Sequence, residues 1–308
     1  MRAFVVTALA LLGCVPEFED NLSTVVEPRL LAIQAEPAEV EEGGSVTFRA
    51  LVAARDEAAL PVPSWSLCLT RKPLTELGPV SPECLTVTDD GSGKVSALGD
   101  GSEVVTTVPT DACKLFGPTR PEPEPGELPG RPVDPDTTGG YYQPTTAALD
   151  EVLSIGSVRL NCGLTGASRS TIQAYNAAYR PNTNPTIAAL DIPETVVAGS
   201  EVTLRASWDE CPADDVTPVE GCGAESYVSY DSENGELDPR REGLRLAWYA
   251  SGGLFERELT GREETDLATD STNIWTAPAI AGSHTVWLVL RDSRGGSSWQ
   301  RYDIEVVP

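Results

Sequence analysis

The chain has 308 residues, a formal net charge of -25 from 47 acidic and 22 basic residues, and 40% hydrophobic residues. This length suits two domains of roughly 120 to 150 residues each. The 27 glycines and 25 prolines favour an all-β fold of short strands joined by turns. Because so acidic a chain repels a phosphate backbone, we expect no nucleic-acid partner.

The N-terminal stretch MRAFVVTALALLGC has the pattern of an export signal. Arg2 supplies a positive start, and Ala3 to Leu12 form a short apolar segment. As a helix this segment would measure about 15 Å, too short for an apolar bilayer core of about 30 Å. The LLGC at its end resembles the bacterial lipobox, in which signal peptidase II cuts before a cysteine that carries diacylglycerol. The resemblance implies cleavage between Gly13 and Cys14 (signal peptide 1–13) and lipid attachment at Cys14; a plain cleaved signal and an uncleaved start are the alternatives.

Six cysteines remain when Cys14 is set apart, and an even number in an exported chain indicates disulfides. The sequence leaves the connectivity open. Proximity along the chain favours three pairs: Cys68 with Cys84, Cys211 with Cys222, and therefore Cys113 with Cys162. A zinc site is not expected, because the spacings include no CxxC pair and the chain has one histidine, His284.

Residues 14–28 are predicted to form a tether, because they are acidic and turn-forming and have no sustained periodicity. The body that follows contains an internal repeat. PAEVEEGGSVTFRA at 37–50 and PETVVAGSEVTLRA at 193–206 align without gaps and share half of their residues. Each copy has a glycine turn followed by strict alternation of apolar and polar residues, which predicts a half-buried strand. The inward-facing residues would be Val46, Phe48 and Ala50 in the first copy, and Val202, Leu204 and Ala206 in the second.

Three further strands are predicted after the second copy. GLRLAWY at 243–249 would place Leu244, Leu246 and Trp248 on its buried face. TVWLVL at 285–290 is apolar on both faces, which is typical of a central strand. The glycine-rich turn at 291–298 then predicts a hairpin with WQRYDIEVV at 299–307, whose inward residues would be Tyr302, Ile304 and Val306.

These strands, with WTAP at 275–278 and the LRDSRGG turn, resemble an immunoglobulin-like repeat of the PKD or cadherin-like kind. Together with the lipobox, RLLAIQAEP at 29–37 and WSLCL at 65–69, they make the chain similar to myxobacterial-type surface lipoproteins with tandem immunoglobulin-like domains. The resemblance implies an all-β fold of two tandem β-sandwiches and an envelope location, and it carries over no ligand-binding residue.

The predicted domain organisation is a first sandwich at 29–180, a linker at 181–186 and a second sandwich at 187–308. The first sandwich carries a proline-rich insertion at 117–140, expected to be exposed and stiff. It is also predicted to contain one short helix in SRSTIQAYNAAYR at 168–180, with Ser170 and Gln173 as an N-terminal capping box.

No enzyme motif stands out. The sequence lacks GxSxG, His284 is the one histidine available as a base, and GSGKVS at 91–96 has the wrong spacing for a phosphate loop. We therefore expect no enzyme activity and no cofactor, with calcium as the one ion worth testing. The acidic stretches DECPADD and DSENGELD could supply oxygen ligands, although neither fits an EF-hand and plain surface loops are the alternative. The candidate ligands are Asp209, Asp214, Asp215, Asp231, Glu233 and Asp238.

The sequence thus predicts a lipid-anchored cell-envelope protein with a structural, adhesive or binding role toward a protein or glycan. Val15, in place of the aspartate that retains many lipoproteins in the inner membrane, favours the outer membrane. The alternatives are a calcium-stiffened spacer and a carboxylate-dependent glycan hydrolase. The hydrolase hypothesis requires two carboxyl groups facing each other about 5 to 9 Å apart in a deep cleft.

Overall fold

The computed structural model describes residues 21–55, 60–72, 77–117, 140–212 and 221–308. In these ranges the chain is predominantly β-structure, which confirms the predicted all-β class. It includes a single 3-10 turn, η1 (Pro82–Cys84), and two short helices, α1 (Ala112–Phe116) and α2 (Arg169–Ala178). The insertion predicted at 117–140 lies almost entirely outside the described residues.

The first half of the described chain forms a sandwich of two sheets. Its strands are β1 (Arg29–Glu36), β2 (Glu39–Val40), β3 (Ser45–Ala53), β4 (Ser64–Cys68), β5 (Val95–Asp100), β6 (Glu103–Thr107), β7 (Gly140–Leu149) and β8 (Val152–Asn161). One sheet has the order β1-β3-β6 and the other β2-β8-β7-β4-β5. Val46 and Phe48 are buried between them with Trp65, as the alternation in β3 predicts.

The second half forms another two-sheet sandwich. Its strands are β9 (Ala189–Asp191), β10 (Thr195–Val197), β11 (Glu201–Ser207), β14 (Leu244–Ala250), β15 (Leu254–Phe255), β16 (Leu259–Arg262), β17 (Asp270–Thr276), β18 (Gly282–Asp292) and β19 (Ser297–Val307). The sheets have the orders β10-β19-β18-β14-β16 and β15-β17-β11-β9. The core contains the inward residues predicted for β14 and the predicted Ile304 and Val306 of β19, with Tyr302 partly buried against them. Trp275 belongs to the same core. The predicted closing hairpin is present as antiparallel β18 and β19.

The two repeat copies occupy equivalent places in the two sandwiches. In each, a short strand precedes the glycine turn and pairs in parallel with a long strand of the opposite sheet: β2 with β8, and β10 with β19. The strand after the turn, β3 or β11, then lies in the other sheet. The chain therefore contains two tandem immunoglobulin-like sandwiches built to one plan.

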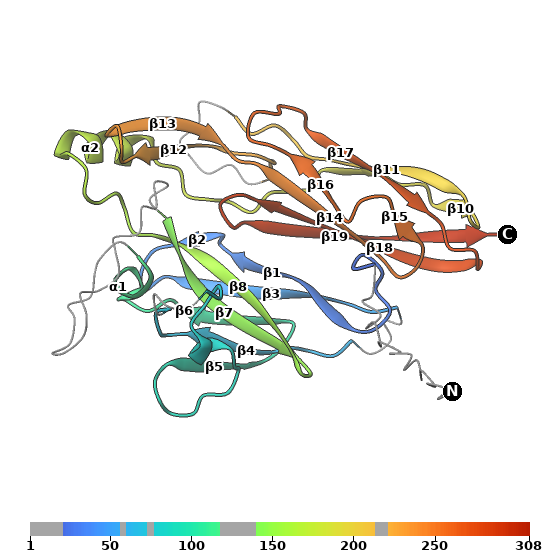
Figure 1. The fold of residues 1–308 in the computed structure, drawn as a ribbon, viewed down its shortest axis with the longest axis horizontal. Coiled ribbons are helices and arrows are strands. Elements are labelled where there is room, and N and C mark those ends of the chain that lie inside the picture. The colour runs from blue at the N-terminus through green and yellow to red at the C-terminus, as the bar shows by residue number, and fades with distance from the viewer. Residues whose placement is uncertain (1–20, 56–59, 73–76, 118–139, 213–220) are drawn as a thin grey trace, which may run out of the picture.

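The two sandwiches are stacked (Figure 1), and their facing sheets, β1-β3-β6 and β10-β19-β18-β14-β16, form the two inner layers. A small apolar cluster joins the two inner layers. Leu31, Ala32, Leu51 and Ala53 come from β1 and β3, and Ala247, Trp287 and Val289 come from β14 and β18. This contact explains the apolar pattern on both faces of TVWLVL. Its even positions face the core of the second sandwich, and its odd positions Trp287 and Val289 face the first sandwich.

The end of the predicted tether is docked on the second sandwich. The Val25 side chain is fully buried in the inter-sandwich cluster. Its backbone N–H donates to the Ala250 carbonyl at 2.8 Å, and Thr24 forms a parallel bridge with Ala250. Residues 21–25 are thus part of the folded body rather than a spacer. Burial of the apolar Val25 side chain away from water stabilises this docked position.

The predicted helix at 168–180 is confirmed as α2, but its cap is not the predicted one. The Ser168 hydroxyl accepts a hydrogen bond from the Thr171 backbone N–H and caps the helix, so Ser170 lies inside the first turn. Tyr175 is buried against a two-stranded hairpin formed by β12 (Ser226–Asp231) and β13 (Glu236–Arg241). The sequence assigns this helix to the first sandwich. In the structure it packs against the β12–β13 hairpin, which belongs to the second half of the chain.

Three disulfides join the six cysteines in the pairs that chain proximity favours: Cys68–Cys84, Cys113–Cys162 and Cys211–Cys222. Disulfides persist mainly in oxidising compartments, such as the periplasm and the cell surface. No helix in the described part of the chain is long and apolar enough to cross a membrane.

Candidate binding cleft between the sandwiches

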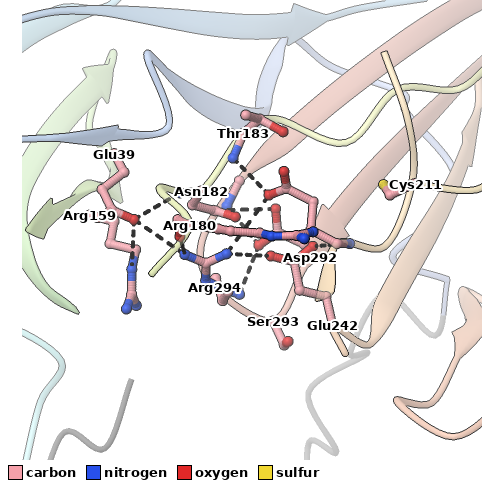
Figure 2. Close-up of polar contacts among 12 residues, drawn as sticks. Glu39, Arg159, Arg180, Asn182, Thr183, Cys211, Glu242, Asp292, Ser293 and Arg294 are labelled. Atoms are coloured by element: carbon pink, nitrogen blue, oxygen red, sulfur yellow. Dashed lines mark hydrogen bonds and ion pairs between the residues drawn. The ribbon is translucent and has the colours of Figure 1, made fainter. Parts of the chain in front are cut away.

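A network of buried charged side chains lies at one edge of the inter-sandwich contact. Arg294 occupies its centre and is 2% exposed. Figure 2 shows it between Glu39 of the first sandwich and Glu242 of the second, with the linker residues Asn182 and Thr183 beside it. Residues that are far apart in the sequence are therefore neighbours here.

The β18–β19 hairpin turn positions Arg294. The Asp292 carboxylate accepts hydrogen bonds from the backbone N–H groups of Arg294 and Gly296, at 2.8 and 2.9 Å. The turn predicted from LRDSRGG thus forms around Asp292 and directs the guanidinium into the contact. There its nitrogens lie 3.4 Å from Glu39, 3.5 Å from Glu242 and 3.8 Å from Glu225, and one donates to the Arg180 carbonyl at 2.6 Å.

Glu39 connects the first sandwich to the linker. Its carboxylate pairs with Arg159 at 3.1 Å and accepts a hydrogen bond from the Asn182 backbone N–H at 2.8 Å. The Tyr179 hydroxyl donates to its other oxygen. Burial raises the pKa of Tyr179, and the neighbouring Glu39 carboxylate raises it further. The phenol therefore stays protonated and remains a donor.

The second sandwich contributes two more carboxyl groups. Glu242 accepts a hydrogen bond from the backbone N–H of Glu225 at 2.9 Å, and Glu225 accepts one from the backbone N–H of Thr183 at 3.0 Å. The predicted linker is consequently hydrogen-bonded to both sandwiches. The Cys211–Cys222 disulfide lies next to this linker, since the Cys222 carbonyl accepts from the Thr186 N–H.

The network contains more carboxyl groups than cations, which affects their protonation. Glu39, Glu225, Glu242 and Asp292 face two guanidinium groups, so full ionisation would leave an excess of negative charge. Burial raises the pKa of Glu242 well above its usual value, and the Asp292 charge adds to this while Arg294 opposes it. Burial likewise raises the pKa values of Glu225 and Asp292.

Arg159 and Arg294 also line an open cleft of about 710 Å³ between the sandwiches. This volume is in the range of about 300 to 1,000 Å³ typical of small-ligand sites. The first sandwich lines it with Arg71, Lys72, Ser81, Tyr142 and Ile155, among others, and the second with Tyr227, Glu264, Ser293 and Arg294.

Two glycines allow close packing against Arg159 and Tyr142, which line the cleft. A Cβ on Gly140 would lie within 2.2 Å of three atoms of the Arg159 guanidinium group. A Cβ on Gly295 would meet the Tyr142 ring at 2.9 Å, and the backbone there has a φ of +103°. Tyr142 in turn donates from its hydroxyl to the Arg294 carbonyl at 2.9 Å. A side chain at Gly140 would displace the Arg159 guanidinium, and a side chain at Gly295 would push against Tyr142 of the first sandwich.

The sequence-predicted site residues are distributed differently. Gly13, Cys14, Asp214 and Asp215 lie outside the described residues. Asp231 accepts hydrogen bonds from the Glu233 and Asn234 backbones and from the Asn234 side chain, and these bonds lower the pKa of its carboxyl group. Within the described ranges no three His, Cys, Asp or Glu side chains are grouped closely enough to hold a metal. The calcium hypothesis remains a prediction, which loss of thermal stability on chelation would support.

The hydrolase hypothesis can be compared with the cleft directly. Among its described lining residues Glu264 is the one carboxylate, and Arg240 pairs with it at 2.5 Å. The hydrolase hypothesis requires two facing carboxyl groups. The described part of the cleft instead presents cationic and tyrosine side chains together with a single carboxylate.

The acidic stretches singled out from the sequence lie in predicted surface loops and do not include the carboxyl groups of the charge network. One indication was present in the repeat, where Glu39 stands at the position that Thr195 holds in the second copy. A carboxylate that replaces a small polar residue in an otherwise similar strand suggests a partner specific to the first sandwich.

No protein-family model matches the chain, and no curated protein matches it. Solved structures with partial likeness include a superoxide reductase (neelaredoxin) from Ignicoccus hospitalis T24K, with 16% identity and a TM-score of 0.25 over 39% of this chain and 78% of that one. Alpha-2-macroglobulin from Escherichia coli in its native conformation has 10% identity and a TM-score of 0.26, over 92% of this chain and 17% of its own. A methylamine-reacted Salmonella alpha-2-macroglobulin has 12% identity and a TM-score of 0.23, over 92% and 16%. This chain thus spans less than a fifth of either macroglobulin, and at these TM-scores the likenesses carry no argument.

Proposed function

We propose that the protein is a lipid-anchored envelope protein whose two sandwiches act as one rigid unit and bind a ligand in the cleft between them. The observation that carries the proposal is the position of the N-terminal segment relative to the cleft. Residues 24 and 25 pair with Ala250 at one end of β14. The other end begins at Leu244, which pairs with Asp292 beside the charge network.

The two ends of β14 are separated by six residue steps, or about 20 Å at about 3.4 Å per residue. In Figure 1 the N-terminal entry and the β18–β19 turn lie at opposite sides of the molecule. A lipid on Cys14 would accordingly place the entry side toward the membrane and the cleft on the far side. The apolar cluster and the clamped linker would preserve that orientation.

The pairing of the cysteines supports the anchor. Three disulfides use the six other cysteines, which leaves Cys14 for another role. Two or more acyl chains, at about 0.8 kcal/mol per buried methylene, give stable attachment where a single chain gives only reversible binding.

The anchor is tested by replacing Cys14 with serine in cells that produce the full chain. Cys14→Ser should abolish labelling by radioactive palmitate and move the protein from the membrane fraction to the soluble fraction. The Cys211→Ser/Cys222→Ser double variant is the matched control, because it removes two thiols and should keep the label. An unchanged membrane fraction for Cys14→Ser would refute the anchor.

A further inference from the structure

The cleft has a local charge opposite to that of the whole protein. The chain carries a net charge of -25, yet Arg71 and Lys72 stand side by side on the cleft wall. Neither takes part in an ion pair among the described residues, whereas Glu264 is already paired with Arg240. Arg159 and Arg294 are balanced from behind by the buried carboxyl groups. The uncompensated charge of the described cleft walls is therefore positive.

Several hydrogen-bond donors along this wall lack a protein acceptor. Within the described chain, the Nη1 atom of Arg71 and the Nε atom of Arg294 are buried without a hydrogen-bond partner. The hydroxyl of Ser81 is also buried without a hydrogen-bond partner among the described residues, and Ser81 as a whole is 2% exposed. The Lys72 ammonium group donates to the Gly78 carbonyl at 2.9 Å and has two further protons to donate. Leaving buried donors unpaired costs free energy, so a ligand acceptor that reaches them from the cleft would be stabilised.

Another part of the wall, on β7 and β8, carries apolar side chains. Tyr142 is 37% exposed and Ile155 is 39% exposed, and Pro144 also lines the cleft. The guanidinium of Arg159 lies 5.8 Å from the centre of the Tyr142 ring and holds that ring in place. An exposed aromatic face fixed beside hydrogen-bond donors suits a ligand that has a ring with one apolar face and polar substituents at its edge.

We propose that the cleft binds an acidic sugar, with the carboxylate or phosphate group on Arg71, Lys72 and Ser81 and the sugar ring against Tyr142 and Ile155. Arg71 is suited to this role because its planar fork matches the geometry of carboxylate and phosphate groups. The inference rests on the proposed binding role of the cleft, and it does not depend on the lipid anchor.

The test uses the purified full-length protein in detergent and titration calorimetry with four probes. The probes are trigalacturonic acid, neutral maltotriose, inorganic phosphate and trialanine, which bears a free terminal carboxylate. We expect trigalacturonic acid to bind at least about tenfold more tightly than the other three. We also expect its affinity to fall as salt is raised, because an exposed ionic contact is screened.

The variant Arg71→Gln/Lys72→Gln should weaken binding of trigalacturonic acid by about tenfold or more. Its matched control is Arg205→Gln/Arg301→Gln, which removes the same charge from two exposed ion pairs of the second sandwich and should bind as the wild type does. Thermal unfolding verifies that both are folded, and Arg71→Lys should bind between the wild type and the double variant.

Three results would overturn the inference. Equal affinity for maltotriose and trigalacturonic acid would show that the acidic group makes no contact that strengthens binding. The cleft would then bind a neutral sugar, and the proposed binding role of the cleft would stand. If phosphate or trialanine bound as tightly as trigalacturonic acid, the sugar ring would contribute nothing to the affinity. Absence of binding by all four probes would likewise refute the acidic-sugar inference, whereas failure of the palmitate test would refute the anchor only.

Discussion

The contact between the two sandwiches has an apolar part and a charged part, and these contribute differently. The apolar part brings together β1, β3, β14 and β18 around Trp287, with Val25 from the N-terminal segment. The charged part joins Glu39, Arg294 and Glu242 through the linker. Apolar burial stabilises at any ordinary pH, whereas a buried ion pair often gains little over apolar packing and is costly when one partner is removed. The apolar part should therefore hold the sandwiches together, and the charged part should set their register and the shape of the cleft.

The largest effect is expected from Arg294→Met. The substitution keeps apolar bulk but leaves the carboxyl groups of Glu39, Glu225 and Glu242 without their shared cation. Breaking a buried pair costs about 3–5 kcal/mol, and we expect the upper end at pH 8, measured by chemical unfolding. At pH 5 the loss should be smaller, because burial raises the pKa values of Glu225 and Glu242 and their protonation removes unpaired charge. An equal loss at both pH values would contradict an ionic role.

Trp287→Ala breaks the apolar part and should cost about 3–4 kcal/mol, since it removes a large buried side chain. In contrast to Arg294→Met, this loss should be the same at pH 5 and pH 8, because the cluster that surrounds Trp287 is built from hydrophobic side chains. Parallel unfolding curves of the two variants at both pH values compare the two parts directly. A pH-dependent loss for Trp287→Ala would show that they are coupled.

The charged part should also make the stability of the unaltered protein depend on pH. Burial raises the folded-state pKa of Glu242 above the ordinary value of 4.5, so the folded state binds the proton more tightly than the unfolded chain does. The stabilisation is therefore complete below that ordinary pKa and is lost as pH rises through the folded-state pKa. Glu242→Gln, which resembles the protonated acid, should flatten the decline of the melting temperature between pH 5 and pH 8. Glu201→Gln, at an exposed position on β11, is the control and should leave the decline unchanged.

The sequence predicts the apolar part of the contact far better than the charged part. Alternation in 243–249 identifies a buried face, and the apolar residues on both faces of 285–290 predict a central strand. The structure buries the second of these faces, with Trp287 and Val289, in the contact. The ionic residues carry no comparable periodic pattern. Glu39 and Arg294 are 255 residues apart and meet only because the β18–β19 turn reaches the short strand β2. Their partners depend on how the two sandwiches stack, which local spacing does not determine.

The smallest effect is expected at the N-terminal segment. It tests whether this segment contributes to the apolar part of the contact between the sandwiches. Val25 is fully buried, whereas its neighbour Val26 is 54% exposed, so the two positions form a matched pair. Val25→Ala should destabilise the protein by about 1–2 kcal/mol through loss of buried methyl groups, and Val26→Ala by less than about 0.5 kcal/mol. Equal effects in chemical unfolding would mean that residues 21–25 contribute nothing to the contact. The proposed orientation of the cleft relative to the membrane would then lose its support, because it depends on the docking of this segment at Ala250.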